Sequence, residues 1–251
     1  MVLTEIRQNV LIITINRPDK KNAINYEAAC QIEAAIDLLD ETDQLFLGIV
    51  TGIGDTFSAG ADLKAIARGE RCGTDRRGGF GILGMPSKKP MIAAVEGFAL
   101  GGGMELCLAC DLIVAARNAK FALPEVRHNA VAIGGGLLRL QHRIPYNIAM
   151  EMALTGQLRS AESLEKLGLV NRVCEDGAAL ETALELSSAI LANGPTALAA
   201  SKQILSSSHL WPENELWERQ ASLAIHATNS ADFNEGLAAF AEKRKPIWRG
   251  C

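Results

Sequence analysis

The spacing of apolar residues predicts alternating strands and helices over the first 190 residues. Four short apolar runs have the length and β-branched content of buried strands. They are Val10–Ile15, Leu45–Val50, Met91–Val95 and Leu112–Ala116. Residues 26–39 carry apolar side chains at helical spacing behind Asn25, a residue type that caps helices. Strand and helix in repeated succession predict an α/β domain.

From Ser160 onward the pattern becomes helical. Ser160 can cap a helix over Ala161–Leu167, another helix ends near Ala192, and two or three more follow Pro195. Their apolar positions are too numerous for a solvated tail, so they should cover the same core or another subunit. We therefore divide the chain into a catalytic core, residues 1–190, and a helical region, residues 191–251.

The segment Ala67–Pro86 interrupts this pattern. It is rich in Gly and Arg and has no periodicity, which predicts a mobile surface loop. Its arginines at 68, 71, 76 and 77 are expected to be solvated, with contact to anionic phosphates as the alternative. Gly79–Gly84 matches the dinucleotide-binding pattern G-x-G-x-x-G, but it follows a loop and not a strand, which argues against a nucleotide cofactor.

Composition and charge narrow the partners. The net charge is -4 and no basic face is evident, which argues against nucleic acid. Six cysteines in a chain too large to need disulfides favour a reducing, cytoplasmic setting. The N-terminus lacks the features of a signal peptide. The most apolar stretch, Met91–Ala116, is interrupted by acidic residues, so we expect no membrane span.

The cysteines and histidines give no sign of a metal site. Cys107 and Cys110 have redox-like spacing, but they lie in an apolar helix without a second pair at metal-ligand spacing. The four histidines show no mutual ligand spacing. We therefore expect no metal.

Two carboxylates stand in sequence that reads as buried. Glu105 follows the glycine run Gly101–Gly103, and Glu125 ends the apolar stretch Phe121–Glu125. Taken singly, each is more often an ion-paired or solvent-facing acid. Two carboxylates over one apolar pocket can instead divide acid and base roles, because burial and mutual repulsion separate their pKa values.

Two glycine-containing turns accompany these acids. Gly101–Gly103 follows a predicted strand and opens a helix, where backbone N–H groups lack partners. Phe57–Lys64 has the same arrangement after the strand Leu45–Val50. A tight structural turn accounts for either one alone. Together they could point two N–H groups at one oxygen, which is an oxyanion hole.

These motifs resemble the crotonase (enoyl-CoA hydratase/isomerase) superfamily, nearly end to end and in the same order. The resembling segments are Phe57–Lys64, Lys89–Gly97, Ala99–Leu106, Phe121–Glu125, Leu154–Gly156, Gly168–Val170 and Phe240–Arg244. The resemblance implies a spiral of ββα units with a C-terminal helical trimerisation region. It also implies a homotrimer or a dimer of trimers.

The resemblance implies roles for individual residues. The backbone N–H groups of Ala61 and Gly102 would hold a thioester oxygen, and Glu105 and Glu125 would be the catalytic acids. Coenzyme A would enter as part of an acyl-CoA substrate, with no other cofactor. The residues expected to contact substrate or coenzyme A are Lys20, Ala59, Ala61, Asp62, Leu63, Ile133, Phe240 and Lys243.

The expected reaction is reversible hydration of an α,β-unsaturated acyl-CoA, with Glu105 activating water and Glu125 delivering the proton. A double-bond isomerase that uses mainly Glu125 is the alternative within the family. A non-catalytic member that binds coenzyme A or RNA is the alternative from another class.

One segment departs from the family pattern. Asn129–Gly136 has Asn129, Ala132 and Ile133 where hydratases usually have Gly, Pro and Gly or Asp. Other segments, such as Ala241–Trp248, resemble the carnitinyl-CoA dehydratases of the family. Ile133 cannot attract a cationic substrate tail, and it fills space, so we expect a small or apolar acyl group.

Overall fold

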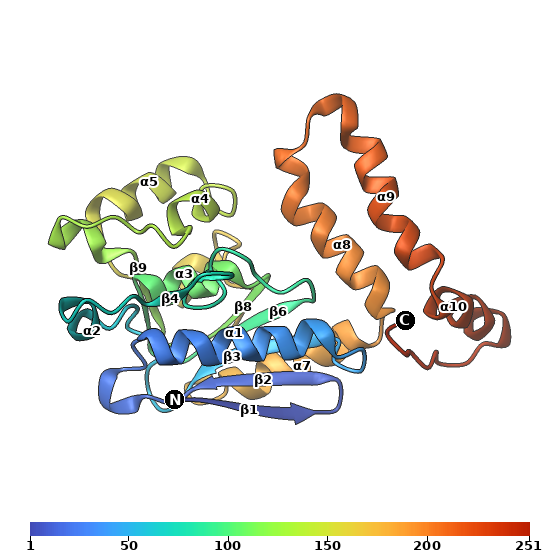
Figure 1. The fold of residues 1–251 in the computed structure, drawn as a ribbon, viewed down its shortest axis with the longest axis horizontal. Helices are drawn as coiled ribbons and strands as arrows, with labels where there is room; N and C mark the ends of the chain where they lie inside the picture. Colours follow the sequence, from blue (N-terminus) through green and yellow to red (C-terminus); the bar gives the residue numbers. More distant parts are fainter.

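A computed structural model describes all residues, 1–251, and places a six-stranded sheet at the centre of the molecule (Figure 1). The strands lie in the order β1-β2-β3-β6-β8-β11. They are β1 (Val2–Arg7), β2 (Val10–Ile15), β3 (Leu47–Gly52), β6 (Met91–Val95), β8 (Leu112–Ala116) and β11 (Arg172–Cys174). β1 and β2 are antiparallel and every other pair is parallel, which confirms the predicted α/β class.

A second, smaller sheet stands beside the first. It consists of β7 (Phe98–Leu100), β9 (Lys120–Ala122) and β10 (Arg159–Ser160), in the order β10-β9-β7. Only two residues separate β6 from β7, so the chain leaves the large sheet and enters the small one at Gly97. This change of sheet carries the chain directly to the glycine turn at Gly101–Gly103. A short pair, β4 (Gly73–Thr74) and β5 (Gly78–Gly79), completes the strands.

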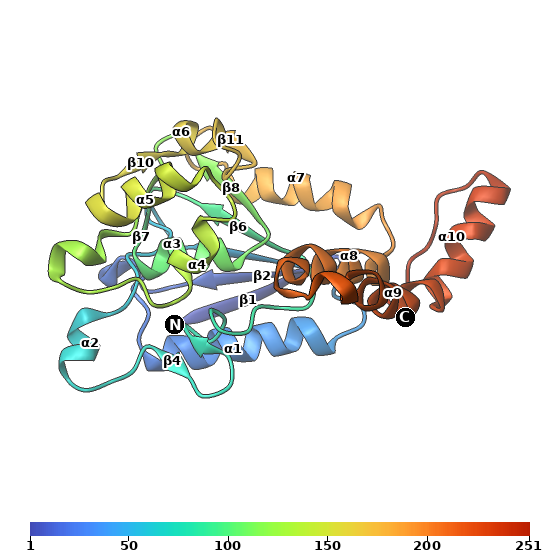
Figure 2. The same cartoon turned by 90° about the horizontal axis from the view of Figure 1, so that it is seen from above.

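Helices cover both faces of the large sheet, as Figure 2 shows for α1 and α7. The α-helices are α1 (Tyr26–Glu41), α2 (Leu63–Ala67), α3 (Gly102–Ala109), α4 (Gly136–Leu140), α5 (Tyr146–Thr155), α6 (Ala161–Glu165), α7 (Ala179–Leu191), α8 (Pro195–Ser207), α9 (Leu216–Thr228) and α10 (Ala231–Glu242). The 3-10 turns are η1 (Pro18–Lys20), η2 (Pro124–His128), η3 (Ser208–Leu210) and η4 (Glu213–Glu215). α1 and α3 pack on one face of the sheet and α7 on the other.

The predicted helix at residues 26–39 is α1, and its sequence explains its position. The Asn25 side chain accepts a hydrogen bond from the Ala28 N–H, which caps the first turn. Ile32, Ile36 and Leu39 follow at intervals of three and four residues and are buried against the sheet. One apolar stripe therefore fixes the helix on the sheet.

The C-terminal helices form an arm that extends away from the sheet (Figure 1). α9 has no buried residue, and Pro195 is the only one in α8. Lys202 attaches the arm to the core, because its ammonium lies 2.7 Å from the Asp111 carboxylate and donates to the Lys89 carbonyl at 2.8 Å. The division into residues 1–190 and 191–251 stays a prediction. No helix in the structure has both the length and the apolar character needed to cross a membrane.

The prediction of a solvated loop at Ala67–Pro86 is wrong for much of the segment. Phe80, Ile82 and Leu83 are buried in the main core, and the Arg77 side chain is only 4% exposed. The acidic outer face of α1 causes the difference, since it supplies counter-charges that the segment alone does not reveal. Of the four arginines, Arg68, Arg71 and Arg76 do remain exposed, and only Arg77 is buried.

Arg77 fastens this segment to α1. Its guanidinium donates to Asp37 at 2.9 Å, to Asp40 at 2.8 Å and to the Met85 carbonyl at 2.9 Å. Asp40 is equally enclosed, with a side chain 6% exposed. Removal of the guanidinium would leave a carboxylate with little access to water, which is far more costly than loss of a surface pair.

We expect Arg77→Met to destabilise the fold by about 3 kcal/mol or more, because Asp40 loses its buried partner. Arg76→Met is the matched control. Arg76 also pairs with Asp37, but its side chain is 50% exposed, so the loss should stay below about 1 kcal/mol. Chemical and thermal unfolding of both variants measure the difference. Equal losses of stability in the two variants would contradict the larger cost that we assign to the buried ion pair.

Candidate active site

The first wall of the candidate site is the turn between β3 and α2. Ser58 exchanges backbone hydrogen bonds with β7: its N–H donates to Phe98 and its carbonyl accepts from Leu100, both at 3.0 Å. On either side of Ala61, the Gly60 carbonyl accepts from Ile24 at 2.8 Å and the Asp62 N–H donates to Ile24 at 2.9 Å. The intervening N–H of Ala61 has no acceptor in the structure. The hydrogen bonds of Gly60 and Asp62 therefore fix the direction of the Ala61 N–H group, which remains free to donate to a ligand.

The second wall is the turn from β7 into α3. Gly101 has φ 55° and ψ -124°, a backbone conformation that residues with a Cβ avoid. It begins α3, so the N–H of Gly102 is one of the helix-terminal donors that have no intrahelical acceptor. A Cβ on Gly60 would lie 3.0 Å from the Gly102 nitrogen, so the two turns are in contact. The structure thus places the turn that contains Ala61 against the turn that contains Gly102, and the joint role of their N–H groups stays a prediction.

Glu105 lies in the first turn of α3 with only 5% of its surface exposed. Its Oε1 accepts a hydrogen bond of 2.9 Å from the Gly136 N–H. Burial raises the pKa of Glu105, and the backbone donors at Gly136 and Gly134 and the charge of Arg139 oppose that rise. Glu105 is thus a buried carboxylate that has donors able to stabilise its ionised form.

Glu125 lies on η2, directly after Pro124. Its Oε2 is buried and has no hydrogen-bond partner, a rare state for a native polar atom. Burial raises the pKa of Glu125, and the negative charge of nearby Glu105 adds to the rise. A Cβ on Gly101 would lie 3.0 Å from its Oε1, so the carboxylate faces the glycine turn. The two acids therefore have different surroundings within one site.

Arg139 is a site residue that the sequence analysis did not find. Its guanidinium donates to the Leu83 carbonyl at 2.6 Å and to the Gly134 carbonyl at 3.1 Å. It thereby ties the 134–136 turn, which donates to Glu105, to the segment that precedes β6. A lone arginine after a glycine run is too common a pattern to reveal this contact.

Asp62 has structural partners that the sequence analysis did not anticipate. Its carboxylate accepts from the Ala65 N–H at 3.1 Å, which caps α2, and lies 3.0 Å from Arg17. Burial alone would raise its pKa, but the Ala65 donor and the Arg17 guanidinium outweigh burial and lower it. The pair holds the chain next to Ala61. Coenzyme A binding by Asp62 stays a prediction.

The other residues predicted to bind substrate fall into two groups. Lys20, Ala59 and Leu63 lie near one another, because the Ala59 N–H donates to the carbonyl of Lys21 and Leu63 opens α2. Phe240 and Lys243 belong to α10 and its C-cap, which lie at the opposite end of the molecule from α2 (Figure 1). Within one chain the structure does not bring these two residues to the site, and their role stays a prediction.

A cavity of about 310 Å³ opens beside Glu125, between η2, α4 and α5. Ala132 lines it, but Ile133 does not, and the Ile133 side chain is 90% exposed. A contact between Ile133 and the acyl group stays a prediction. The cavity wall comes from residues on both sides of Ile133 in the sequence, from η2 and the loop after it to α4 and α5.

The remaining motifs are structural. Cys107 and Cys110 are fully buried in and after α3, and burial raises the pKa of the Cys110 thiol to about 12. Gly79–Gly84 forms a tight turn in which Phe80 packs against Gly102. No group of three or more His, Cys, Asp or Glu side chains is placed to hold a metal ion.

Comparison with known proteins adds an independent observation. The chain matches the family described as Enoyl-CoA hydratase/isomerase over residues 5–251. A carnitinyl-CoA dehydratase of Salmonella typhi is 42% identical over 96% of this chain and 95% of its own. A mevalonyl-coenzyme A hydratase of Aspergillus fumigatus is 38% identical, over 96% of this chain and 92% of the length of that protein. The crystal structure of an enoyl-CoA hydratase from Mycobacterium tuberculosis superposes with a TM-score of 0.97 at 50% identity, covering 100% of this chain and 99% of that one.

Glu125→Gln should stabilise the fold at neutral pH. The folded-state pKa of Glu125 is raised, so between the unfolded and folded pKa values the native state binds more protons, and stability falls as pH rises through this window. Glutamine has no proton to release, so the variant does not lose this stability as the pH rises. We expect a higher Tm than wild type at pH 8 and a smaller gain at pH 5. Glu185→Gln, at an exposed position on α7, is the control. A gain that does not depend on pH would contradict this account.

Proposed function

We propose that this chain, which belongs to the enoyl-CoA hydratase/isomerase family, catalyses the reversible syn hydration of an α,β-unsaturated acyl-CoA thioester. The relatives are named hydratases and dehydratases, and the chain is a lyase of that type. One observation carries the proposal: the buried Glu105 and the half-buried Glu125 lie beside two turns in contact, whose N–H groups at Ala61 and Gly102 have no acceptor.

The thioester oxygen would accept hydrogen bonds from Ala61 and Gly102. Addition of water at Cβ places negative charge on that oxygen, and the first turn of α3 adds the positive end of its dipole. Removal of one oxyanion donor typically costs about 2.7–4 kcal/mol in the transition state. Because both N–H groups are fixed by their neighbours, little rearrangement is needed when the charge develops.

The surroundings of the two acids support different roles for them. Glu105 has the Gly136 donor and the charge of Arg139, which favour its ionised form, so we assign it as the base that activates water. Glu125 has an unpartnered oxygen and the negative field of Glu105, which favour its protonated form. It would therefore deliver the proton to Cα, and dehydration reverses both roles.

The alternatives are weaker on specific observations. An isomerase would need mainly Glu125, whereas Glu105 is the more deeply buried of the two acids and has its own hydrogen-bond donor. An RNA-binding member of the fold would be expected to carry a basic face, and the net charge is -4. The proposed reaction adds water across the double bond, forming a C–O bond at Cβ and a C–H bond at Cα without net oxidation or reduction, so it calls for no redox cofactor. The coenzyme A part of the substrate would lie near Lys20, Ala59 and Leu63.

The C-terminal arm supports an assembly of several chains. Large apolar side chains on the arm face solvent in the single chain. They include Leu205, Leu210, Trp217, Ile225, Phe233, Leu237 and Phe240. Exposed apolar surface on this scale marks an interface. We propose a homotrimer or a dimer of trimers with a ββα spiral in each subunit, and a cytoplasmic location suited to six free cysteines.

Glu105→Gln and Glu125→Gln should each lower turnover by a factor on the order of 10² or more, because each removes a proton-transfer group. Binding of a saturated acyl-CoA should change little, since the Ala61 and Gly102 donors are intact. Loss of enoyl-thioester absorbance measures turnover, and Glu185→Gln is the control. Unchanged turnover in both variants would overturn the assignment.

Trp217→Glu should weaken the assembly, because it places a charge on an exposed apolar face of α9, where Trp217 is 81% exposed. Light scattering after size exclusion, at several protein concentrations, measures the mass. Glu218→Gln, next to it on the same helix, should leave the mass unchanged. A monomeric wild-type protein would contradict the proposed assembly.

A further inference from the structure

We infer that Arg139 is a positioning residue for Glu105: its guanidinium holds the turn at Gly134–Gly136, and that turn holds the Glu105 carboxylate in place for the proposed activation of water. The inference rests on the proposed function and adds to it a residue that acts through Glu105. Three observations carry it. The turn encloses the carboxylate, little besides Arg139 holds the turn, and the other end of the Arg139 contact is fixed.

The turn at Gly134–Gly136 encloses the Glu105 carboxylate. The Gly136 N–H donates to Glu105 Oε1 at 2.9 Å. A Cβ on Gly134 would lie 2.6 Å from Oε2 of Glu105, and a Cβ on Gly136 would lie 3.0 Å from Oε1, so both oxygens lie against the backbone of the turn. A shift of the turn therefore either moves the carboxylate or breaks its hydrogen bond.

The chain that leads into this turn has few contacts of its own. Residues 131–134 take part in no backbone–backbone hydrogen bond, and only Ala132 of these four is buried. Glycine adds conformational freedom, and Gly135 has a φ of 94°. The Arg139 guanidinium donates to the Gly134 carbonyl at 3.1 Å, and no other side chain donates to this stretch. Arg139 therefore determines where the turn lies.

The other end of the Arg139 contact is fixed in the core. The guanidinium also donates to the Leu83 carbonyl, at 2.6 Å. The Leu83 side chain is 4% exposed and its N–H donates to Gly79 at 2.8 Å, while the N–H of Gly84 donates to the Arg77 carbonyl at 2.9 Å. A guanidinium presents its donors in one rigid plane, so it can hold two carbonyl groups at a set separation. The flexible ammonium of a lysine does this less well.

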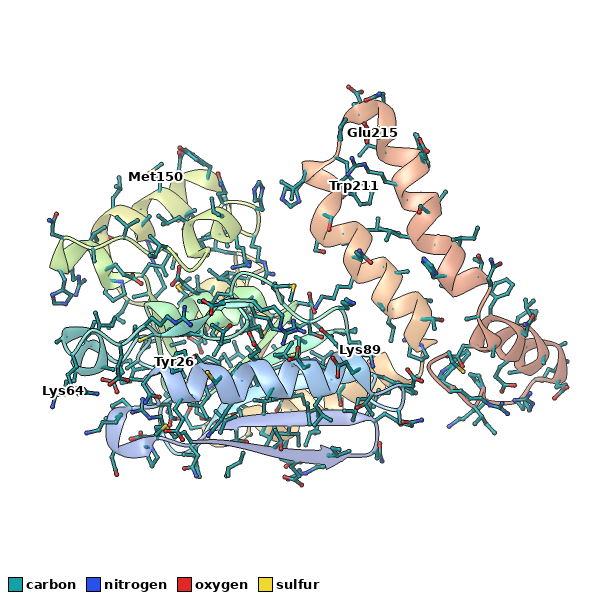
Figure 3. All side chains as sticks on the ribbon, viewed as in Figure 1. Tyr26, Lys64, Lys89, Met150, Trp211 and Glu215 are labelled. Atoms are coloured by element: carbon teal, nitrogen blue, oxygen red, sulfur yellow. The ribbon has the colours of Figure 1, made fainter.

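The fold brings Arg139 close to Glu105. Arg139 lies on α4, which packs against α3, the helix that carries Glu105. On its other side α4 contacts α5, the helix that bears Met150 in Figure 3. Burial raises the pKa of Glu105, and the charge of Arg139 is among the influences that oppose this rise. Arg139 thus acts on Glu105 both through the turn and through its charge.

Arg143 is a matched comparison four residues further along the chain. Both arginines are half-buried. The Leu83 and Gly134 carbonyl groups accept from Arg139 and not from Arg143, and the acid whose charge acts on Arg143 is Asp111. Arg143 therefore shares the charge and the burial of Arg139 without its contact to the turn.

The test combines Arg139→Gln with Glu105→Gln in the full-length protein, on whichever of crotonyl-, hexenoyl- and crotonobetainyl-CoA the wild type hydrates fastest. Arg139→Gln alone should lower kcat about tenfold or more, because a small displacement of a reacting group is costly. Binding of butyryl-CoA, measured by calorimetry, should change less than about twofold. With Glu105→Gln already present, Arg139→Gln should lower kcat by less than about twofold further, since the group on which it acts is absent. Equal losses in the two backgrounds would overturn the inference.

The pH dependence of kcat is a readout that a purely structural role would not move. Glu105 must be ionised to accept a proton, so kcat falls on the acid side of the profile. Arg139→Gln removes a charge that lowers the pKa of Glu105, so this acid limb should move to higher pH. Arg139→Lys keeps the charge, so its acid limb should stay at the wild-type position, with a plateau kcat between wild type and Arg139→Gln. An acid limb that Arg139→Gln leaves in place would contradict the inference.

The controls separate this inference from the proposed function. Arg143→Gln removes an equal charge and should change the plateau kcat by less than about twofold. An equal loss in Arg143→Gln would overturn the inference, and so would a wild-type kcat in Arg139→Gln, and both leave the proposed function standing. Inactivity of the wild type on all three thioesters overturns both. If Arg139→Gln does not fold, Arg139→Lys with and without Glu105→Gln carries the same comparison.

Discussion

The rest of the site depends on the close approach of two glycine turns. Gly60 and the start of α3 lie so near one another that a Cβ on Gly60 would stand 2.8 Å from the Leu100 carbonyl oxygen. At this distance only backbone fits between the two turns, and each turn carries an N–H group without an acceptor, at Ala61 and Gly102. One turn follows β3 of the large sheet, the other follows β7 of the small sheet, and Ser58 joins them through its backbone hydrogen bonds to β7.

This arrangement is unfavourable for the fold. A carboxylate oxygen of Glu125 has lost water without gaining a donor, and Glu105 keeps only part of its hydrogen-bonding capacity. Such features persist where the surrounding structure determines them, as the Arg139 and Arg17–Asp62 contacts do here. Both carboxylates lack part of their hydrogen bonding and so weaken the native state. In the proposed reaction, Glu125 would be the acid and the charge of Glu105 would contribute to the electrostatic field.

Sequence reasoning found the features that depend on local chemistry. Four of the six strands of the large sheet, α1 with its Asn25 cap, both glycine turns and both glutamates are visible in short stretches of residues, and the resemblance to the crotonase superfamily is confirmed. Sequence reasoning did not find the features that depend on partners far away along the chain. The surroundings of Arg77 were unpredictable because its acids lie on α1, some 40 residues away along the chain. The contacts of Arg139 and the surface position of Ile133 likewise depend on how separate segments meet.

The lack of space at the glycine turns has a consequence for how such a protein can change. A side chain at Gly103 would collide with the Ser58 carbonyl, and one at Gly102 would collide with the Phe80 ring, so even alanine disturbs the reacting centre. The wall of the cavity on α5 has no such restriction, because Met150 and Leu154 are partly open to solvent. Substitutions should therefore act very unevenly: the turns at Gly102 and Gly103 have no room for a side chain, whereas exposed positions on α5 such as Met150 and Leu154 can accept a different one.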